Sequence, residues 1–179
     1  DYDVKHFVFS SSCSVYGNAE QLPVTEETPF QKAESPYAST KVMGEDICSR
    51  FAIAHPDFKV ILLRYFNPAG AHPSCLIGEY NEKPENLVPV ITQTAIGIRK
   101  EMTVFGTDYS TRDGSCIRDY IHVSDIAHAH TLAMDKSMAN TLASNCEVFN
   151  LGTGEGVTVL ELIHTFEKVT GMKLPYQLG

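Results

Sequence analysis

The hydrophobic pattern of this chain shows short apolar runs separated by longer segments with helical character. Val4 to Phe9 is an apolar run that ends in Ser10-Ser11-Ser12, and Lys59 to Phe66 is a second run. Such runs are typical of strands buried on both faces of a sheet. The segment 35–54 between them carries the helix-start signal Ser35-Pro36. Strand, helix and strand in succession predict a parallel α/β sheet, with functional loops beyond the carboxyl ends of the strands.

Shorter segments follow Gly70. They predict a helix over 87–100, a strand over 103–105, an extended segment over 118–123, a helix over 124–134 and a strand over 147–151. Thr158 and Glu161 form a capping box for a last helix ending near Gly171. We therefore expect the later part of a doubly wound (Rossmann-type) domain over 1–67 and a smaller α/β domain over 68–179. The sequence leaves open whether strands after residue 118 return to the first sheet.

Composition narrows the classes of function. The chain has 179 residues, a net charge of −8 and 43% hydrophobic residues. An acidic balance argues against a nucleic-acid partner, because phosphate backbones are bound by clustered Lys and Arg. A diphosphate remains a possible ligand, since one or two arginines can hold it. The longest apolar runs are shorter than a bilayer-spanning helix, so no membrane partner is expected.

Cysteine and histidine positions indicate no metal or disulfide framework. The five cysteines are an odd number, are widely spread and include no C-x-x-C pair. His128 and His130 are two residues apart and would point in different directions on a helix. We expect reduced thiols, a cytoplasmic location and no metal site.

Tyr37 and Lys41 form the pattern Tyr-x-x-x-Lys within the predicted helix. Residues four apart lie on one helix face, one turn apart. A free phenol has a pKa of ~10, and lowering it to ~7 requires about 4 kcal/mol of preferential stabilisation. A neighbouring ammonium favours the phenolate and supplies part of this stabilisation. The pattern is weak alone, but a hydroxyl at the end of the preceding strand, in Ser10-Ser11-Ser12, completes a Ser–Tyr–Lys arrangement suited to removing a hydroxyl proton.

Several motifs, in order, resemble the extended short-chain dehydrogenase/reductase superfamily. They are Ser10-Ser11-Ser12-x-x-Val15-Tyr16-Gly17, Ser35-Pro36-Tyr37-x-x-x-Lys41 and Leu63-Arg64-Tyr65-Phe66-Asn67-Pro68-Ala69-Gly70-Ala71-His72-Pro73. The last of these, with Asn86-Leu87-Val88-Pro89 and Arg118-Asp119-Tyr120-Ile121-His122-Val123, resembles the UDP-glucose 4-epimerases within that superfamily. The resemblance extends from residue 4 to about residue 171.

The resemblance implies a set of site residues. The catalytic residues would be Ser12, Tyr37 and Lys41. NAD would be bound by Ser10, Ser11, Ser12, Tyr37, Lys41, Tyr65 and Phe66. The UDP-sugar substrate would be bound by Ser12, Tyr37, Asn67, Asn86, Leu87, Thr103, Val104, Phe105, Arg118, Asp119 and Tyr120. For Arg118 there is also a chemical reason, because a guanidinium matches diphosphate oxygens with two parallel hydrogen bonds.

The implied reaction is the interconversion of UDP-glucose and UDP-galactose, an isomerase activity of galactose metabolism. NAD would take hydride from C4 of the hexose while Tyr37, directly or through Ser12, takes the 4-hydroxyl proton. The resemblance also implies a homodimer. Two parts of the family pattern are missing: the glycine-rich loop that cradles the pyrophosphate, and late positions of the sugar pocket. We therefore expect an incomplete and inactive piece of an epimerase.

Other functions fit these residues less well. A 4,6-dehydratase or decarboxylase on the same scaffold would carry an acidic residue after Ser12, where this chain has Cys13 and Ser14. Epimerases of other sugar nucleotides, including uronic acid and N-acetyl forms, stay open. A silent nucleotide-binding protein would be expected to have lost Tyr37 or Lys41. The loop Gly152 to Gly156 has the spacing G-x-G-x-G rather than G-x-G-x-x-G, which favours a tight turn over a phosphate cradle.

Overall fold

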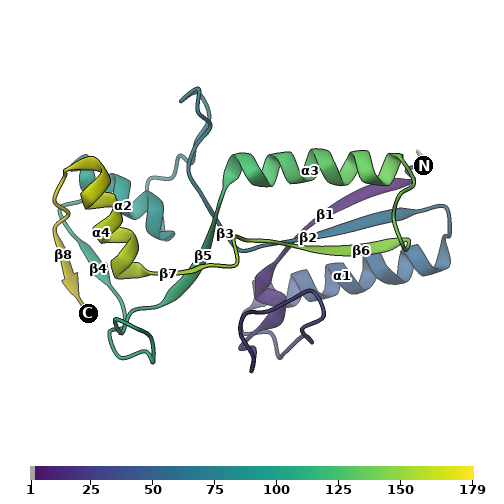
Figure 1. The fold of residues 1–179 in the computed structure, drawn as a ribbon, viewed down its shortest axis with the longest axis horizontal. Helices are drawn as coiled ribbons and strands as arrows, with labels where there is room; N and C mark the ends of the chain where they lie inside the picture. The colour runs from purple at the N-terminus through teal and green to yellow at the C-terminus, as the bar shows by residue number, and fades with distance from the viewer. Residues whose placement is uncertain (1–2) are drawn as a thin grey trace. The chain divides into compact units, whose positions relative to one another are not determined.

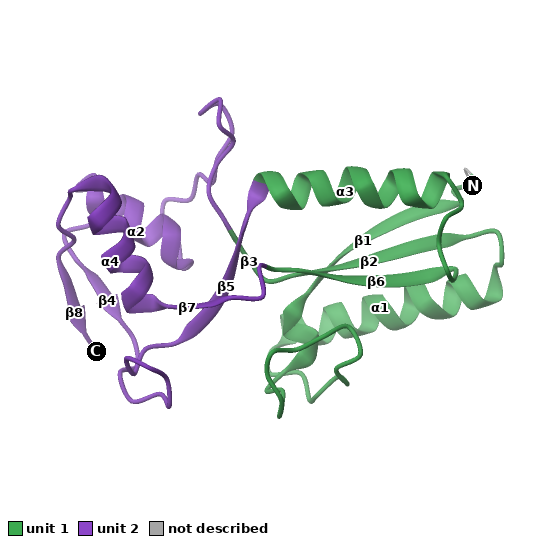
Figure 2. Ribbon diagram, in the orientation of Figure 1, with its two compact units in different colours: residues 1–68, 124–152 green, residues 69–123, 153–179 purple. Residues whose placement is uncertain are grey.

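The computed structural model describes residues 3–179, which divide into two compact units (Figure 2). Unit 1 runs to Pro68 and resumes over Ser124–Gly152, and unit 2 comprises Ala69–Val123 and Thr153–Gly179. The first boundary lies beside the expected one at residue 67. The second unit differs from the expected continuous segment 68–179, because residues 124–152 belong with unit 1.

Unit 1 is built on a three-stranded parallel sheet in the order β1-β2-β6 (Figure 1). Its strands are β1 (His6–Ser12), β2 (Lys59–Tyr65) and β6 (Cys146–Leu151). The central strand β2 is buried over Val60 to Arg64, as its continuous apolar run predicts for a strand covered on both faces. Strand β6 answers the question that the sequence left open, since it returns to this sheet after a long excursion through unit 2.

The two faces of this sheet are covered by different helices, α1 (Pro36–Ala54) and α3 (Val123–Met138). Side chains of β2 alternate between them. Val60 and Leu62 pack in one cluster with Ala52 of α1, whereas Ile61 and Leu63 pack in another with Ala133 of α3. This alternation follows from the two-residue period of a strand. Position 64 therefore faces α1, and position 65 faces α3.

Unit 2 has a separate core, formed by Ile91, Met102, Val104, Ile163 and Leu174. Its elements are α2 (Leu87–Ala95), β4 (Met102–Val104), β5 (Ile117–His122), β7 (Gly156–Thr158), α4 (Val159–Thr170) and β8 (Tyr176–Leu178). Strands β4 and β8 pair in parallel, and β5 pairs antiparallel with β7. The short strand β3 (Asn67–Ala69) lies at the boundary between the units.

Local capping signals place the helix ends where the sequence predicts them in α1 and α4. The Ser35 side chain accepts from the backbone N–H of Ala38, and Thr158 and Glu161 form both hydrogen bonds of a capping box. Helix α2 is shorter than the predicted 87–100, because the chain turns at Gly97, which has a φ of +76°. Helix α3 is longer than predicted and continues to Met138. The sequence did not predict β3, β7, β8 or the 3₁₀ helix Cys13–Tyr16.

Candidate active site

The three serines at the end of β1 point in alternating directions. Ser10 and Ser12 pair in register with Leu63 and Tyr65, whereas Ser11 pairs with Arg64 and faces α1. The Ser12 hydroxyl oxygen accepts from the Ser14 backbone N–H at 3.2 Å and so caps the 3₁₀ helix that follows. The Ser12 side chain is therefore held at the carboxyl end of the sheet, where ligands of doubly wound folds bind.

Tyr37 and Lys41 lie in the first two turns of α1. Lys41 Nζ donates a hydrogen bond to the backbone carbonyl of Ser10 at 2.8 Å and lies 5.3 Å from the centre of the Tyr37 ring. This bond fixes the ammonium between the end of β1 and the phenol. Tyr37 itself is 57% exposed. The structure therefore places the Lys41 ammonium beside both the Ser10 carbonyl and the Tyr37 ring, and Ser12, Tyr37 and Lys41 remain the predicted catalytic residues.

On the face of the sheet covered by α3, Tyr65 forms hydrogen bonds with Ser10 and with His130. Its hydroxyl lies 2.8 Å from the Ser10 hydroxyl and 2.7 Å from Nε2 of His130, a residue of α3. His130 Nδ1 lies 2.9 Å from the Ile126 carbonyl oxygen, a pure acceptor, so Nδ1 carries a proton. Burial raises the pKa of Tyr65, and the hydrogen bond with Ser10 offsets this only in part. Tyr65 therefore stays a neutral hydrogen-bonding group, and His130 is a neighbour that the sequence did not indicate.

A buried ion pair lies on the other side of the sheet. Arg64 of β2 donates through Nε and Nη2 to the Glu45 carboxylate of α1, with a closest distance of 2.7 Å, and the two side chains are only 5% and 3% exposed. Burial alone lowers the pKa of Arg64, but the hydrogen bonds with Glu45 and Tyr16 outweigh it and the pKa is raised. The sequence analysis missed this pair, although an arginine inside an apolar strand was a signal for it.

Two further candidates follow β2 directly. The Phe66 backbone N–H donates to the Leu151 carbonyl at 3.1 Å, which extends the β2–β6 pairing past the end of β2. Asn67 opens β3. Both residues remain predicted ligand-binding positions at the end of a buried strand, Phe66 for the cofactor and Asn67 for the substrate.

Candidates in unit 2 occupy the starts and ends of elements around its core. Asn86 is the N-cap of α2, its side chain makes no capping hydrogen bond there, and Leu87 begins the helix. Thr103 and Val104 lie in β4, and Phe105 after it is 79% exposed. An exposed aromatic ring suits a stacked base, and a cap amide without a capping hydrogen bond suits a polar ligand edge. These residues remain predicted substrate positions.

The remaining candidates lie in β5, where the Asp119 carboxylate holds a neighbouring loop. Oδ1 of Asp119 accepts from the Thr153 backbone N–H and hydroxyl, and Oδ2 accepts from the Gly154 N–H at 2.9 Å. Asp119 thus anchors the Gly152 to Gly156 loop. The same bonds occupy backbone donors that a phosphate cradle would need, which supports the tight-turn interpretation of this loop.

Arg118 and Tyr120 flank that anchor. Arg118 Nη1 donates to the Ile117 carbonyl at 2.7 Å, and the residue is exposed, so other donors of its guanidinium are available to an anion. Burial raises the pKa of Tyr120, which keeps its hydroxyl protonated. Both remain predicted substrate positions. The structure thus places the candidate cofactor residues in unit 1 and most candidate substrate residues in unit 2.

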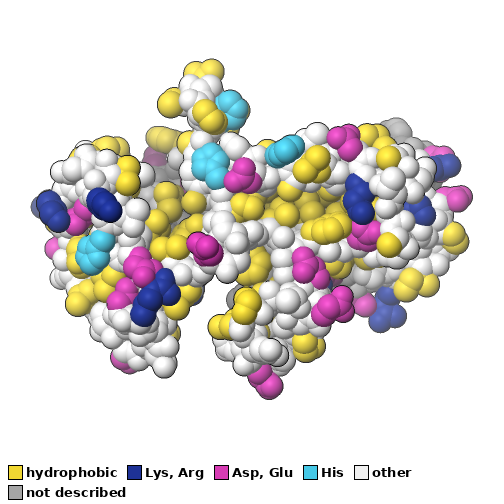
Figure 3. Space-filling view, in the orientation of Figure 1, with side chains coloured by type: hydrophobic (Ala, Val, Ile, Leu, Met, Phe, Trp, Pro, Cys, Tyr) yellow, Lys and Arg dark blue, Asp and Glu magenta, His cyan; other side chains and the backbone are white. Residues whose placement is uncertain are grey.

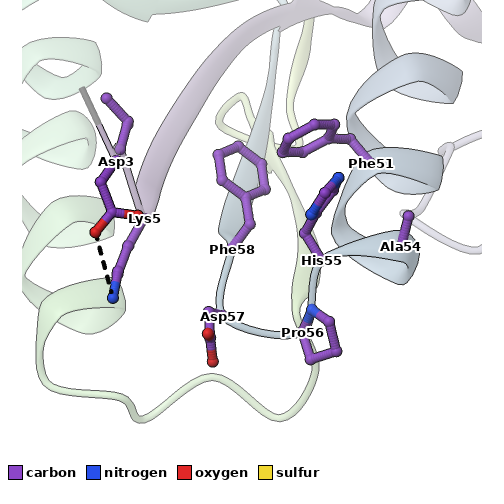
Figure 4. Close-up of a pocket in the computed structure, with 9 residues that line it drawn as sticks. Asp3, Lys5, Phe51, Ala54, His55, Pro56, Asp57 and Phe58 are labelled. Carbon is purple, nitrogen blue, oxygen red and sulfur yellow. Dashed lines mark ion pairs between the residues drawn. The ribbon is translucent and has the colours of Figure 1, made fainter. Parts of the chain in front are cut away.

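A pocket in unit 1 lies away from these residues (Figure 4). It is lined by residues around the amino ends of β1 and β2, including Lys5, Phe51, His55 and Phe58. Because Ser12 lies at the carboxyl end of β1, this pocket is at the opposite end of the sheet from the candidate active site.

Residues 3–179 contain no group of three or more His, Cys, Asp and Glu side chains placed to hold a metal ion. Over the same residues, no helix combines the length and the apolar character needed to cross a bilayer. On the face shown in Figure 3, Lys and Arg side chains form separate spots rather than one basic patch.

Comparison with known proteins identifies the class. Residues 1–152 match the model of the NAD dependent epimerase/dehydratase family, and the chain belongs to this family. This match confirms the predicted superfamily and the expectation of an NAD-dependent protein.

Comparison with individual proteins gives a narrower resemblance than the family match. The chain is 49% identical over 177 residues to a UDP-glucose 4-epimerase of Yersinia enterocolitica, covering 98% of this chain and 51% of that protein. It is 50% identical to UDP-glucose 4-epimerase 2 of Arabidopsis thaliana, covering 97% of this chain and 49% of that protein. The chain thus spans about half the length of the curated relatives it matches.

Solved structures agree with the predicted α/β Rossmann-type fold. A UDP-glucose 4-epimerase from Stenotrophomonas maltophila with bound NAD and formylated UDP-arabinopyranose superposes with a TM-score of 0.93 at 45% identity, covering 98% of this chain and 52% of that one. The enzyme from Bifidobacterium longum in complex with NAD⁺ and UDP gives 0.90 at 44% identity, with the same coverage.

Polar groups around the carboxyl end of β1 suit a hydroxyl-rich ligand such as NAD. Lys41 uses one N–H on the Ser10 carbonyl, which leaves other donors of its ammonium available to a ligand. Tyr37, whose ring centre lies 5.3 Å from this ammonium, is 57% exposed. A hydroxyl acceptor, an ammonium and a strand-end serine thus converge on one region of unit 1.

Proposed function

We propose that the protein, at its full natural length, interconverts UDP-glucose and UDP-galactose at C4 of the hexose. The observation that carries this proposal is the contact of Lys41 with both the Ser10 carbonyl and the Tyr37 ring, at the carboxyl end of a parallel sheet. The identity to UDP-glucose 4-epimerases supports the choice of substrate. Unit 1 then binds NAD, and unit 2 binds the nucleotide part of the sugar.

Each residue has a defined task in this reaction. NAD, when bound, supplies the acceptor and later the donor of the hydride at C4. Tyr37 takes the proton of the 4-hydroxyl and returns it at the end of the reaction. The Lys41 ammonium stabilises the phenolate form of a neighbouring tyrosine. Ser12 holds the sugar oxygen at the strand end and orients its proton toward Tyr37.

The nucleotide would be held by residues of unit 2. Arg118 pairs with the diphosphate through its available guanidinium donors. Phe105 offers an exposed ring to the base, and Asn86 offers its unengaged side-chain amide. Asp119 contributes by holding the loop beside β5 rather than by direct contact, since its oxygens already accept from Thr153 and Gly154.

Location and assembly form part of the same proposal. We propose a cytoplasmic homodimer. Five cysteines without a disulfide, at positions 13, 48, 75, 116 and 146, suit a reducing compartment. Met43, Ile47 and Phe51 follow one another at four-residue spacing on α1 and are all exposed, which supports a helix face covered by a second subunit.

The test compares wild-type protein of full natural length with Tyr37→Phe, using UDP-galactose. We expect kcat, compared at equal NAD content, to fall by about 10²- to 10⁴-fold, the usual contribution of one acid–base group. A folded, NAD-loaded wild type without activity on UDP-galactose would contradict the substrate assignment. The same assay with N-acetylated and uronic acid sugar nucleotides would then identify which related epimerisation takes place.

A further inference from the structure

The Glu45 carboxylate joins the helix that carries Tyr37 to the strand that carries Ser12. Tyr37, Lys41 and Glu45 follow one another at four-residue spacing, so they share one face of α1. Glu45 lies one turn beyond Lys41 on the side toward the sheet and is 3% exposed. Its oxygen accepts a hydrogen bond from the Ser11 hydroxyl, and Ser11 immediately precedes Ser12. A direct polar link therefore runs from α1 to the last residues of β1.

Arg64 of β2 holds the Glu45 carboxylate in this position. The guanidinium of Arg64 donates through Nε and Nη2 to Glu45, and through Nη1 to the Tyr16 hydroxyl at 2.8 Å. Tyr16 lies in the 3₁₀ helix that Ser12 caps, and its hydroxyl donates to Asn150 Oδ1 of β6 at 2.6 Å. These hydrogen bonds thus connect α1 with β1, β2 and β6 of unit 1 and with the 3₁₀ helix after Ser12.

Close packing at the same contact leaves little room for α1 to move. Gly44 precedes Glu45, and a methyl group at that position would collide with the Phe9 ring of β1. The backbone of α1 therefore approaches β1 directly. The Glu45–Arg64 ion pair beside this contact sets the position of α1 along β1. Packing alone is not directional, whereas a carboxylate held by a guanidinium fork has a defined geometry.

We propose that Glu45 is a positioning residue of the active site. Held by Arg64, it docks α1 on the end of β1 through Ser11, and thereby fixes Tyr37 and Lys41 opposite Ser12. The proposal rests on the proposed function, because it assigns those three residues to catalysis. A purely structural role would mean that the pair matters only for the stability of unit 1.

The experiment, on the protein of full natural length, separates an effect of Glu45 on the position of Tyr37 and Lys41 from an effect on the stability of unit 1. Replacing a buried ion pair by apolar residues of similar volume often preserves stability, so we compare Glu45→Gln with the double variant Glu45→Leu plus Arg64→Met. Val60→Ala is the matched control, because it weakens the same sheet near its amino end without touching the polar group. The measurements are the thermal midpoint, kcat and KM for UDP-galactose, and hydrogen exchange of peptides covering residues 10–16 and 36–42.

We expect the double variant to stay folded, with a thermal midpoint lowered because the Ser11 and Tyr16 hydroxyls lose a partner, and to lose about 100-fold in kcat, the effect of a misplaced catalytic group, with KM little changed. Both peptides should exchange faster than in wild type, and Val60→Ala should lower the thermal midpoint while leaving kcat and those peptides unchanged. Stable folding of the double variant with wild-type kcat and wild-type exchange would overturn the proposal.

One further variant, Ser11→Ala, keeps the result interpretable. Ser11→Ala removes the link from β1 and leaves the ion pair intact, so it tests the proposal if the double variant does not fold. The Ser11 side chain is 1% exposed and donates to Glu45, so its loss should lower kcat and speed exchange over 10–16 in NAD-saturated protein, and no change in either would contradict the proposal. If wild type is inactive on UDP-galactose, the proposed function fails, and hydrogen exchange alone decides whether Glu45 holds the two segments together.

Discussion

Lys41 lies with its ammonium 5.3 Å from the centre of the Tyr37 ring, while its Nζ donates to the Ser10 carbonyl at 2.8 Å. The four-residue spacing brings the two side chains to one helix face, but it does not fix where the flexible lysine ends. The Ser10 carbonyl fixes this position by holding the ammonium at the end of β1. The positive charge is thus placed by the sheet as much as by the helix.

Replacement of Lys41 by Met should therefore remove the charge while keeping most of the apolar stem. We expect kcat for UDP-galactose to fall by about 10²-fold or more in the full-length protein, because the proposed base Tyr37 loses its neighbouring cation. Bound NAD should also decrease, since ribose donors are lost. Lys168→Met, a change at an exposed position of α4, is the control. Equal activity of both variants would show that Lys41 has no catalytic role.

Gly44→Ala should disturb the approach of α1 to β1. A methyl group there meets the Phe9 ring, and overpacking of this kind typically costs about 1–3 kcal/mol. The gain in helix propensity returns about 1 kcal/mol, so we expect a net loss of up to about 2 kcal/mol. Urea unfolding measures this loss. Adding Phe9→Leu to the variant should recover part of it by making room, and absence of any recovery would mean that the collision is relieved elsewhere.

Tyr16→Phe should destabilise unit 1 although only one oxygen is removed. The Tyr16 hydroxyl accepts from Arg64 and donates to Asn150, and the residue is 2% exposed. Arg64 would lose a buried hydrogen bond and Asn150 a partly buried one, and an unsatisfied buried polar group costs about 1–3 kcal/mol. Tyr80→Phe, at a position 93% exposed, is the matched control and should be neutral. The expected result is a lower urea midpoint for Tyr16→Phe at an unchanged slope.

Features set by neighbouring residues could be predicted from the sequence. The caps at Ser35 and Thr158 were predicted because a cap is a contact between residues three apart. The buried strand β2 was predicted because a strand covered on both faces has a continuous apolar run. Tyr37 and Lys41 were found because helical spacing alone brings them together.

Features set by residues distant in sequence could not be predicted. The return of β6 to the first sheet depends on pairing between Val60 and Cys146, for which there is no local signal. The anchoring of the Gly152 to Gly156 loop depends on Asp119, more than thirty residues earlier. Glu45 and Arg64 were each visible in the sequence, but only the fold shows that they form a pair.

The ion pair of Arg112 and Glu161 should make unit 2 sensitive to acid. Hydrogen bonds from Arg112 and from the Thr158 backbone lower the pKa of Glu161 from its ordinary value of 4.5 to about 2. A carboxylate with a lowered pKa in the folded state contributes stability above its unfolded pKa, and this contribution is lost as pH falls through the folded pKa. The contribution of Glu161 is therefore complete above about pH 4.5 and is lost between about pH 4.5 and pH 2.

Thermal midpoints of wild type and Glu161→Gln, measured from pH 7 down to pH 2, test this expectation. The variant should melt lower at neutral pH, and the two curves should converge toward pH 2, because a protonated Glu161 no longer pairs with Arg112. Asp113, whose pKa is also lowered, chiefly by a hydrogen bond from Thr158, titrates in both proteins, so the difference between them isolates Glu161. Glu155→Gln, in the loop before β7, provides a control with the same loss of charge. Parallel curves for wild type and Glu161→Gln across this range would mean that the pair does not form in solution.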